Sequence, residues 1–257
     1  IFSDGKNISV GAPYFNLVTV PIAFFLAFFQ GYGVLTKWQE SPLELKPFLI
    51  ILLFLFSLSI FFSYLIFNDL SLFNLAGIIM LSLILAGVFL SAFRNFNKGK
   101  LFFNSFGMNL AHFGIAVTIL GIGVVSSHSD SKEVILDIGE SVKLNNYEFT
   151  LLEEGTRKES NFFSQIAHFE VENLASGKTF NLKPEKAFYP ASKSVMTESA
   201  ISINLKEDVY ISLSERLDTG EWIAKIQTKP FIRFIWLGAL LMTLGGVFAF
   251  TRRVFIR

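Results

Sequence analysis

The chain contains no cysteine among its 257 residues, and this absence removes several classes of chemistry. Without a thiol, the protein has no disulfide, no thiolate ligand for a metal and no cysteine nucleophile. The sequence also lacks the phosphate loop GxxxxGK[ST], the zinc protease pattern HExxH and the nucleophile turn GxSxG. It therefore carries no signature of nucleotide hydrolysis, zinc proteolysis or thiol exchange.

Charge is also scarce. Charged residues make up 17% of the chain and hydrophobic residues 52%, with 31 phenylalanines. This composition is typical of an integral membrane protein. The first residue is isoleucine and no signal-peptide pattern precedes the first apolar segment, so we expect the start of the sequence to be a fragment boundary.

The small net charge of +1 conceals an uneven distribution. Residues 128–228 carry eleven Lys and Arg against seventeen Asp and Glu, whereas the remainder carries eleven against four. We expect the acidic block to be a separate domain outside the membrane. The positive charges occur in short clusters at the ends of apolar segments, so the sequence does not predict a nucleic-acid surface.

Five segments reach the roughly 20 apolar residues that cross a bilayer: residues 15–36, 47–67, 73–93, 104–126 and 231–250. Pro21 lies inside the first of them and predicts a bend or a break there, because proline removes a backbone donor. Basic residues gather in two short clusters: Arg94, Lys98 and Lys100, and Arg252, Arg253 and Arg257. The positive-inside rule places both clusters in the cytoplasm or the mitochondrial matrix, with the N-terminus and residues 128–228 on the outer side.

The acidic block has the pattern of a β domain. Two-residue alternation occurs in six segments: 133–138, 147–152, 165–174, 200–205, 208–213 and 221–227. Turn residues separate them at Asn145-Asn146, at 175–178 and at 218–220. We predict six to eight strands in a small antiparallel barrel or sandwich. The predicted organisation is therefore a four-helix membrane region (1–127), an extracytoplasmic all-β domain (128–228), and a final transmembrane helix with a basic tail (229–257).

His112 lies inside the fourth span, in a stretch of about 29 residues without a full charge between Lys100 and Asp130. An ionisable side chain at membrane depth is costly and predicts a functional partner. One interpretation is an axial ligand of a membrane haem, since neutral imidazole binds haem iron. The other is a histidine that is hydrogen-bonded to a backbone carbonyl or to Asn109.

A second face of the same span carries small residues: Gly107, Ala111, Gly114, Thr118 and Gly121. Such a stripe favours close helix packing. At about 100° per residue, His112 points about 140° away from the stripe. The sequence thus predicts that helix packing and the histidine use different faces.

Other candidate ligands are weaker. His128 follows the fourth span directly and is either a site residue or an ordinary interfacial side chain. His168 alternates in phase with two glutamates and is interpreted as part of a solvated strand face. Met80, Met108 and Met242 are possible iron ligands, but methionine more often fills gaps in a core.

Six segments occur together in one order: SVGAPYFN (9–16), NLAHFGIAV (109–117), FYP (188–190), MTESAI (196–201), DVYISL (208–213) and KPFIRFIWLGALLMTLGG (229–246). The ordered set resembles the C-terminal part of the haem lyase family of cytochrome c maturation, whose members are cytochrome c-type biogenesis proteins. The related haem lyase of nitrite reductase maturation shares the pattern. The resemblance covers the chain nearly from end to end.

The resemblance implies an enzyme that attaches haem covalently to the Cys-x-x-Cys-His motif of apocytochrome c, on the outer side of the membrane. It also implies a membrane haem b, with His112 matching one of its axial histidines. The implied partners are apocytochrome c, a haem-delivering chaperone, thiol-reducing maturation subunits and an N-terminal haem lyase region. The implied location is the bacterial inner membrane with the β domain in the periplasm, or the mitochondrial inner membrane.

The chain departs from the family pattern in several places. It has no tryptophan-rich segment, neither of the outer histidines that flank that segment, and no second intramembrane histidine; Lys186-Ala187 stands where an arginine is expected. We therefore do not expect the chain alone to perform the ligation. Two further hypotheses remain open: a non-catalytic membrane subunit that docks apocytochrome or the haem chaperone, and half of a transporter or channel, which the lack of acidic residues in the spans disfavours.

Overall fold

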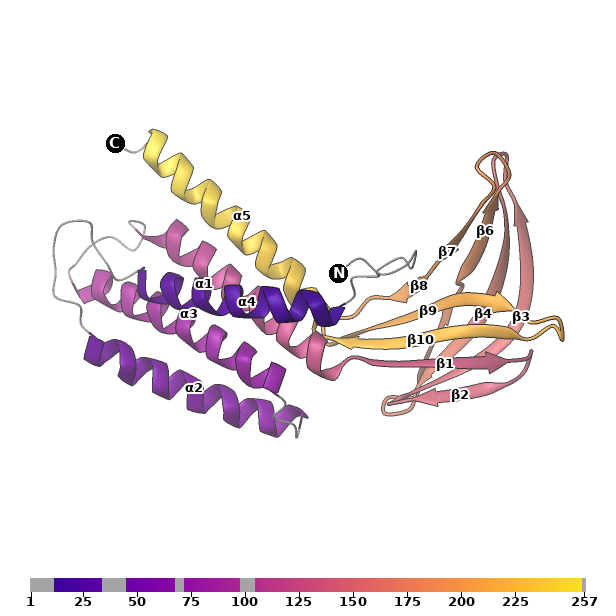
Figure 1. Cartoon of the computed structure of the whole chain (residues 1–257), viewed down its shortest axis with the longest axis horizontal. Coiled ribbons are helices and arrows are strands. Elements are labelled where there is room, and N and C mark those ends of the chain that lie inside the picture. Colours follow the sequence, from indigo (N-terminus) through magenta and orange to yellow (C-terminus); the bar gives the residue numbers. More distant parts are fainter. Residues whose placement is uncertain (1–11, 34–44, 68–71, 98–104, 256–257) are drawn as a thin grey trace, which may run out of the picture. The chain divides into compact units, whose positions relative to one another are not determined.

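The computed structural model describes residues 12–33, 45–67, 72–97 and 105–255, and the chain divides into two units. The first is helical and takes in residues up to 123 and from 234 onward; the second holds residues 124–233 and is mostly β (Figure 1). Lys98, Lys100 and Arg257, which the orientation argument used, lie outside the described residues.

The described part contains five helices long and apolar enough to cross a membrane, as predicted. They are Ala12–Gly33 (α1), Leu45–Phe67 (α2), Leu72–Asn97 (α3), Phe106–His128 (α4) and Ile232–Phe255 (α5). Helix α1 continues through Pro21 without a break. These helices are apolar on all sides, because in lipid every face must be apolar and every backbone group must be satisfied within the helix.

Helix α3 is the centre of the first three helices, since it packs against both α1 and α2. Over its most apolar stretch 56% of α3 is buried, whereas none of the corresponding stretch of α2 is. One apolar cluster joins α1, α3 and α4 through Ala27, Ile84 and Ala116. The crossing of α1 and α3 depends on Gly31 and Gly87, because a Cβ atom on either would meet the backbone of the other helix.

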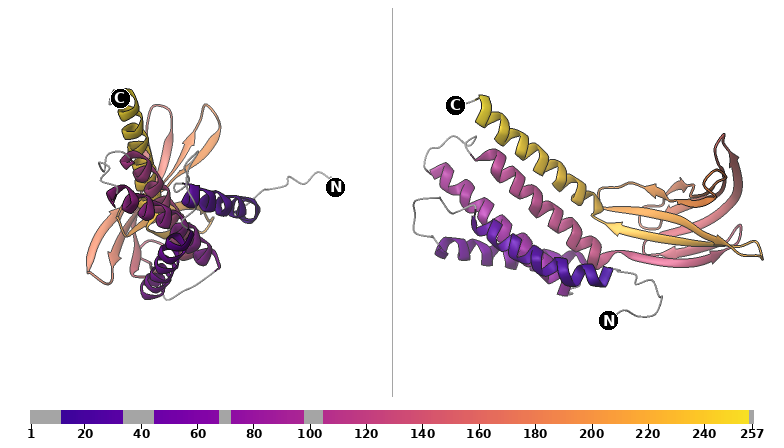
Figure 2. Two further views of the ribbon diagram at one scale, coloured as in Figure 1. Left: turned by 90° about the vertical axis from the view of Figure 1, so that its left-hand side faces the viewer. Right: turned by 45° about the horizontal axis from the view of Figure 1, so that its top comes forward.

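Helices α4 and α5 lie side by side (Figure 2). They pack through the small-residue stripe that the sequence predicted on α4. A Cβ atom added at Gly114 would lie 2.7 Å from the Gly238 carbonyl oxygen, and one added at Gly107 would lie 2.7 Å from that of Gly245. Real Cβ contacts are not this short, so glycine is required at these positions if the two backbones are to approach so closely.

The second unit is an antiparallel sandwich of two sheets. Its strands are Asp130–Leu136 (β1), Ser141–Leu144 (β2), Tyr147–Lys158 (β3), Phe163–Asn173 (β4), Lys178–Leu182 (β5), Glu185–Tyr189 (β6), Ser194–Glu198 (β7), Ala200–Ser202 (β8), Glu207–Arg216 (β9) and Trp222–Pro230 (β10). One sheet has the order β1-β10-β9-β8; the other has the order β2-β3-β4-β6-β7, with β5 paired to β4. The sandwich, one of the two predicted architectures, is confirmed.

The described residues form ten strands rather than six to eight. The four strands outside the predicted segments are short. Strands β2, β5, β6 and β7 have four or five residues each and bury few side chains, and every side chain of β7 is exposed. The core between the sheets includes Phe149, Phe169, Ile211, Leu213 and Trp222, all almost fully buried. Burial of such a side chain contributes about 1.5–3 kcal/mol relative to exposure.

Candidate functional site

His112 lies in α4 with its imidazole Nδ1 at 2.8 Å from the carbonyl oxygen of Met108, one turn earlier. A carbonyl only accepts hydrogen bonds, so Nδ1 carries the proton and donates it. The neutral ring then keeps its lone pair on Nε2. Histidines that bind metals commonly donate their second ring nitrogen to a carbonyl in this way, which fixes the tautomer and the ring orientation.

The face of α4 that carries His112 is opposite to the contact with α5. Ala116, one turn above His112 on the same face, is fully buried in the cluster that joins α1, α3 and α4. Glycines 107, 114 and 121 instead meet α5. The predicted separation of the histidine from the packing stripe is therefore present, and His112 lies on the side of α4 where α1 and α3 pack.

Asn109, three residues before His112, keeps a buried polar atom without a partner. Its Oδ1 accepts no hydrogen bond from the described residues, and its Nδ2 donates only a long one, 3.4 Å, to the Ser105 hydroxyl. Buried polar atoms in folded proteins nearly always have a partner, so an unpaired one calls for an explanation. This unpaired amide oxygen lies one turn from the His112 imidazole.

Within the described residues no group of three or more His, Cys, Asp or Glu side chains could hold a metal ion. His128 lies sixteen positions beyond His112 at the end of α4, which is about 24 Å along the helix at 1.5 Å per residue. The two histidines therefore cannot bind one iron. Among the described residues, His112 is the histidine that lies within an apolar span.

The remaining candidates occupy ordinary structural positions. His168 Nδ1 lies 2.9 Å from a carboxylate oxygen of Glu153 across strands β3 and β4. Met80 is buried in the apolar cluster of α1, α3 and α4, where its flexible side chain fills space. Met242 lies in the contact between α4 and α5.

Two groups of residues in the sandwich were not predicted. Asp208 is fully buried and ion-paired with Arg233, with 2.7 Å between Oδ2 and Nη2. A cavity is lined by Lys158, Phe163 and Lys186, among others, from neighbouring strands. Both depend on strand register, and sequence alternation alone does not say which residues of different strands lie opposite each other.

The chain was compared with known proteins. Residues 127–230 match the family described as the CcmF C-terminal beta-sandwich. The cytochrome c-type biogenesis protein CcmF of Pseudomonas aeruginosa is 34% identical over 96% of this chain, and CcmF of Escherichia coli is 32% identical over 94%. The cytochrome c-type biogenesis protein NrfE of Haemophilus influenzae is 28% identical over 95%.

The chain spans 38% of the length of each of these three relatives. A solved structure named Cytochrome c Heme Lyase CcmF has the same fold, with a TM-score of 0.77 at 20% identity over 93% of this chain and 40% of that one. The likeness supports the fold of membrane helices and sandwich described above.

Proposed function

We propose that this chain, which is similar to the CcmF family of cytochrome c-type biogenesis proteins, is the C-terminal part of a bacterial membrane haem lyase. In this proposal the helical unit holds a haem b and the sandwich is an outer docking domain. The complete assembly attaches haem covalently to apocytochrome c. The remaining parts of the activity come from an N-terminal haem lyase region, a haem-delivering chaperone and thiol-reducing maturation subunits.

The observation that carries the proposal is the hydrogen bond of the His112 imidazole to the Met108 carbonyl. This hydrogen bond leaves Nε2 as the free lone pair, and the unpaired Oδ1 of Asn109 lies within one turn. Haem bound there would supply an iron centre that changes its oxidation state. The protein's contribution is to orient the imidazole, through the Met108 carbonyl, in a region without full charges.

We further propose that the sandwich lies in the periplasm and the basic ends of α3 and α5 in the cytoplasm. Arg94 lies in the last turn of α3, and Arg252 and Arg253 lie in the last turn of α5. The positive-inside rule assigns the basic ends of both helices to the cytoplasmic side, so both support the same orientation in the inner membrane. Haem attachment to exported apocytochrome would then take place on the side of the sandwich.

The test is the haem content of the purified chain and of its His112→Ala variant, measured as the reduced-minus-oxidised pyridine haemochrome spectrum. We expect a b-type spectrum in the wild type and at least a tenfold lower haem content in the variant, because the neighbouring described residues offer no replacement imidazole. His128→Ala and Phe113→Ala are the matched controls and should keep their haem. Far-UV circular dichroism establishes that all variants remain helical.

Equal haem content in the wild type and His112→Ala would refute the role of His112. A wild type without haem would favour the second candidate, a non-catalytic docking subunit. That candidate is supported by the size and separate core of the sandwich, which packs without the helices.

A further inference from the structure

The six-stranded sheet has an open inner face at one end. Cross-strand pairing places Lys158, Phe163, Phe188 and Val195 directly opposite one another on β3, β4, β6 and β7, so all four side chains share one face. It is the face that carries buried Ala167 and Phe169 further along β4. Yet Phe163 and Val195 are 50% and 59% exposed, because here the ends of these strands curve away from β9 and β10 (Figure 1).

The next row of the same face closes onto the opposite sheet. Lys186 Nζ donates a hydrogen bond to the Ser214 carbonyl, and Thr197 Oγ1 donates one to the Leu213 carbonyl at 3.2 Å. Both carbonyls belong to β9. The two sheets are thus joined at this row. Beyond it, a cavity of about 490 Å³ lies at the ends of β3, β4, β6 and β7, and all of its lining residues come from these four strands. We call this cavity the sandwich mouth; it is large enough for one or two amino-acid side chains.

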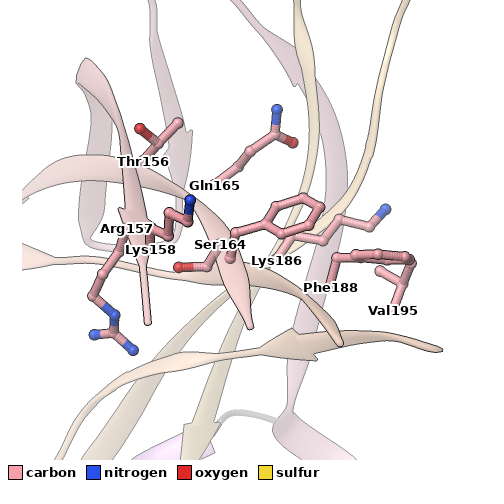
Figure 3. A pocket seen from close by; sticks show the side chains of 9 residues that line it. Thr156, Arg157, Lys158, Ser164, Gln165, Lys186, Phe188 and Val195 are labelled. Carbon is pink, nitrogen blue, oxygen red and sulfur yellow. The ribbon is translucent and has the colours of Figure 1, made fainter. Parts of the chain in front are cut away.

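The charge of the sandwich mouth is opposite to that of its domain. Lys158 and Lys186 face into it and form no ion pair with any described residue (Figure 3). Arg157 points to the reverse face, where Glu185 binds it at 3.1 Å. The carboxylate of Glu154, further along the inner face, is already bound by Arg216 at 2.8 Å. Two ammonium groups beside aromatic rings therefore lack a carboxylate partner among the described residues, in a domain with an excess of acidic residues; Lys186 also donates to the Ser214 carbonyl.

Strand β7 forms one wall of the mouth and also ends its sheet. It pairs with β6 and is last in the strand order of the described residues, and all five of its side chains are exposed. An edge strand presents unpaired backbone N–H and C=O groups to which another extended chain can add. A strand added there would place every second side chain on the inner face, next to Val195 and Phe188.

We propose that the sandwich mouth binds an extended peptide segment that adds a strand to β7. Its inner-facing side chains are a carboxylate, which meets Lys158 and Lys186, and two residues away an aromatic or large apolar side chain. That side chain contacts the rings of Phe163 and Phe188, whose centroids are 4.9 Å apart. The proposed ligand is therefore a peptide with acidic and aromatic side chains. The proposal does not rest on haem binding at His112.

The test is direct binding of synthetic peptides to the full chain in detergent, measured by fluorescence anisotropy. The probe is a seven-residue peptide in which Glu, Phe and Glu alternate with Thr, so that one face carries both carboxylates and the ring. We expect it to bind at least about tenfold more tightly than the same peptide with Lys in place of Glu, because like charges would meet at the mouth. Equal affinity of the two peptides would overturn the proposal.

Two pairs of variants locate the site. Lys158→Glu should weaken binding about tenfold, whereas Lys178→Glu, an exposed lysine at the start of β5, should leave it within about twofold. Phe163→Ala should weaken binding, and Leu174→Ala, similarly exposed in the turn after β4, should not. If the two variants of either pair changed peptide affinity equally, binding would be non-specific and the proposed site would be wrong.

Two N-methylated peptides test strand addition. Alternate N–H groups of a strand point to the same side, so methylation of the Thr nitrogens and methylation of the Glu and Phe nitrogens block opposite edges. We expect one pattern to abolish binding and the other to preserve it. Equal binding by the two methylated peptides would overturn pairing with β7.

Discussion

Both carboxylate oxygens of Asp208 contact Arg233, the second residue of α5: Nη2 to Oδ2 is 2.7 Å and Nε to Oδ1 is 3.2 Å. The backbone N–H of Asn204 donates a further bond to Oδ1 at 2.9 Å. Such a two-pronged arginine pair satisfies a carboxylate that is fully buried. It also joins β9 to Arg233, the last residue of the sandwich unit.

Replacement of Arg233 by alanine should destabilise the sandwich by about 3–5 kcal/mol, because Asp208 would remain as a buried charge without a counter-ion. The measurement is a denaturant titration followed by the fluorescence of Trp222, which is buried in the core, with Trp38 and Trp236 changed to phenylalanine. Arg157→Ala is the control. Its pair with Glu185 is partly exposed, so its loss should cost about 1 kcal/mol or less. A cost for Arg233→Ala as small as that of the control would contradict the argument.

The Glu207 carboxyl should make the stability of the sandwich depend on pH. Burial raises the pKa of the Glu207 carboxyl, and the negative charge of Asp130 adds to the rise; hydrogen bonds from Tyr147 and Thr228 oppose it without cancelling it. A carboxyl whose pKa is higher in the folded state favours folding when it is protonated. Its contribution is complete below the ordinary pKa of glutamate and is lost as the pH rises through the raised pKa.

The change Glu207→Gln should therefore raise the unfolding temperature at neutral pH. It should also make the unfolding temperature less dependent on pH between the ordinary pKa of glutamate and the raised pKa of Glu207. A glutamine side chain still accepts the hydrogen bond from Tyr147, so the packing is retained. Thermal unfolding at a series of pH values measures the effect. Glu172→Gln, an exposed strand residue, controls for the change in net charge. A wild-type sandwich that gains stability as the pH rises through this range would contradict the assignment.

At the scale of elements, the contact between α4 and α5 is made of glycine and other small residues. A Cβ atom at Gly114 would lie 2.7 Å from both the Gly238 carbonyl oxygen and the Met242 nitrogen. We expect Gly114→Ala to separate the two helices and to destabilise the helical unit by about 1–3 kcal/mol. The measurement is the loss of helical circular dichroism as dodecyl sulfate replaces a mild detergent. Gly246→Ala is the matched control, since its Cβ atom would meet nothing within 4 Å.

The sequence predicted the packing face of α4, though not its partner α5, because small residues at helical spacing favour close helix packing within a membrane. The turns were equally accessible: Asn145, Gly177 and Gly220, inside the three predicted turns, all have positive φ. Strands β6 and β7 were missed because they pair at the edge of the sheet and bury few side chains. Alternation is visible only where one face of a strand is buried.

At the scale of the whole molecule, the sequence allowed the number of spans, the separate sandwich and the intramembrane histidine to be predicted. It did not reveal the sandwich mouth, because Lys158, Phe163 and Phe188 are brought together by the pairing of three strands. A single histidine in an apolar span carries a strong physical signal because burial of an ionisable group there is costly. A lysine on a strand carries no such signal until the residues opposite it on the neighbouring strands are known.

The orientation of the molecule in the membrane is the last prediction. The chain has no cysteine, so a single introduced thiol reports its side of the membrane without background. We expect a membrane-impermeant maleimide to label Ser176→Cys, in the exposed turn after β4, in intact spheroplasts. Val254→Cys, beside Arg252 and Arg253 at the end of α5, should be labelled only after permeabilisation. The reason is that arginines at span ends are retained on the cytoplasmic side, which places the segment before the last span outside. The cysteine-free chain is the control, and the reverse pattern would place the sandwich in the cytoplasm and contradict the proposed orientation.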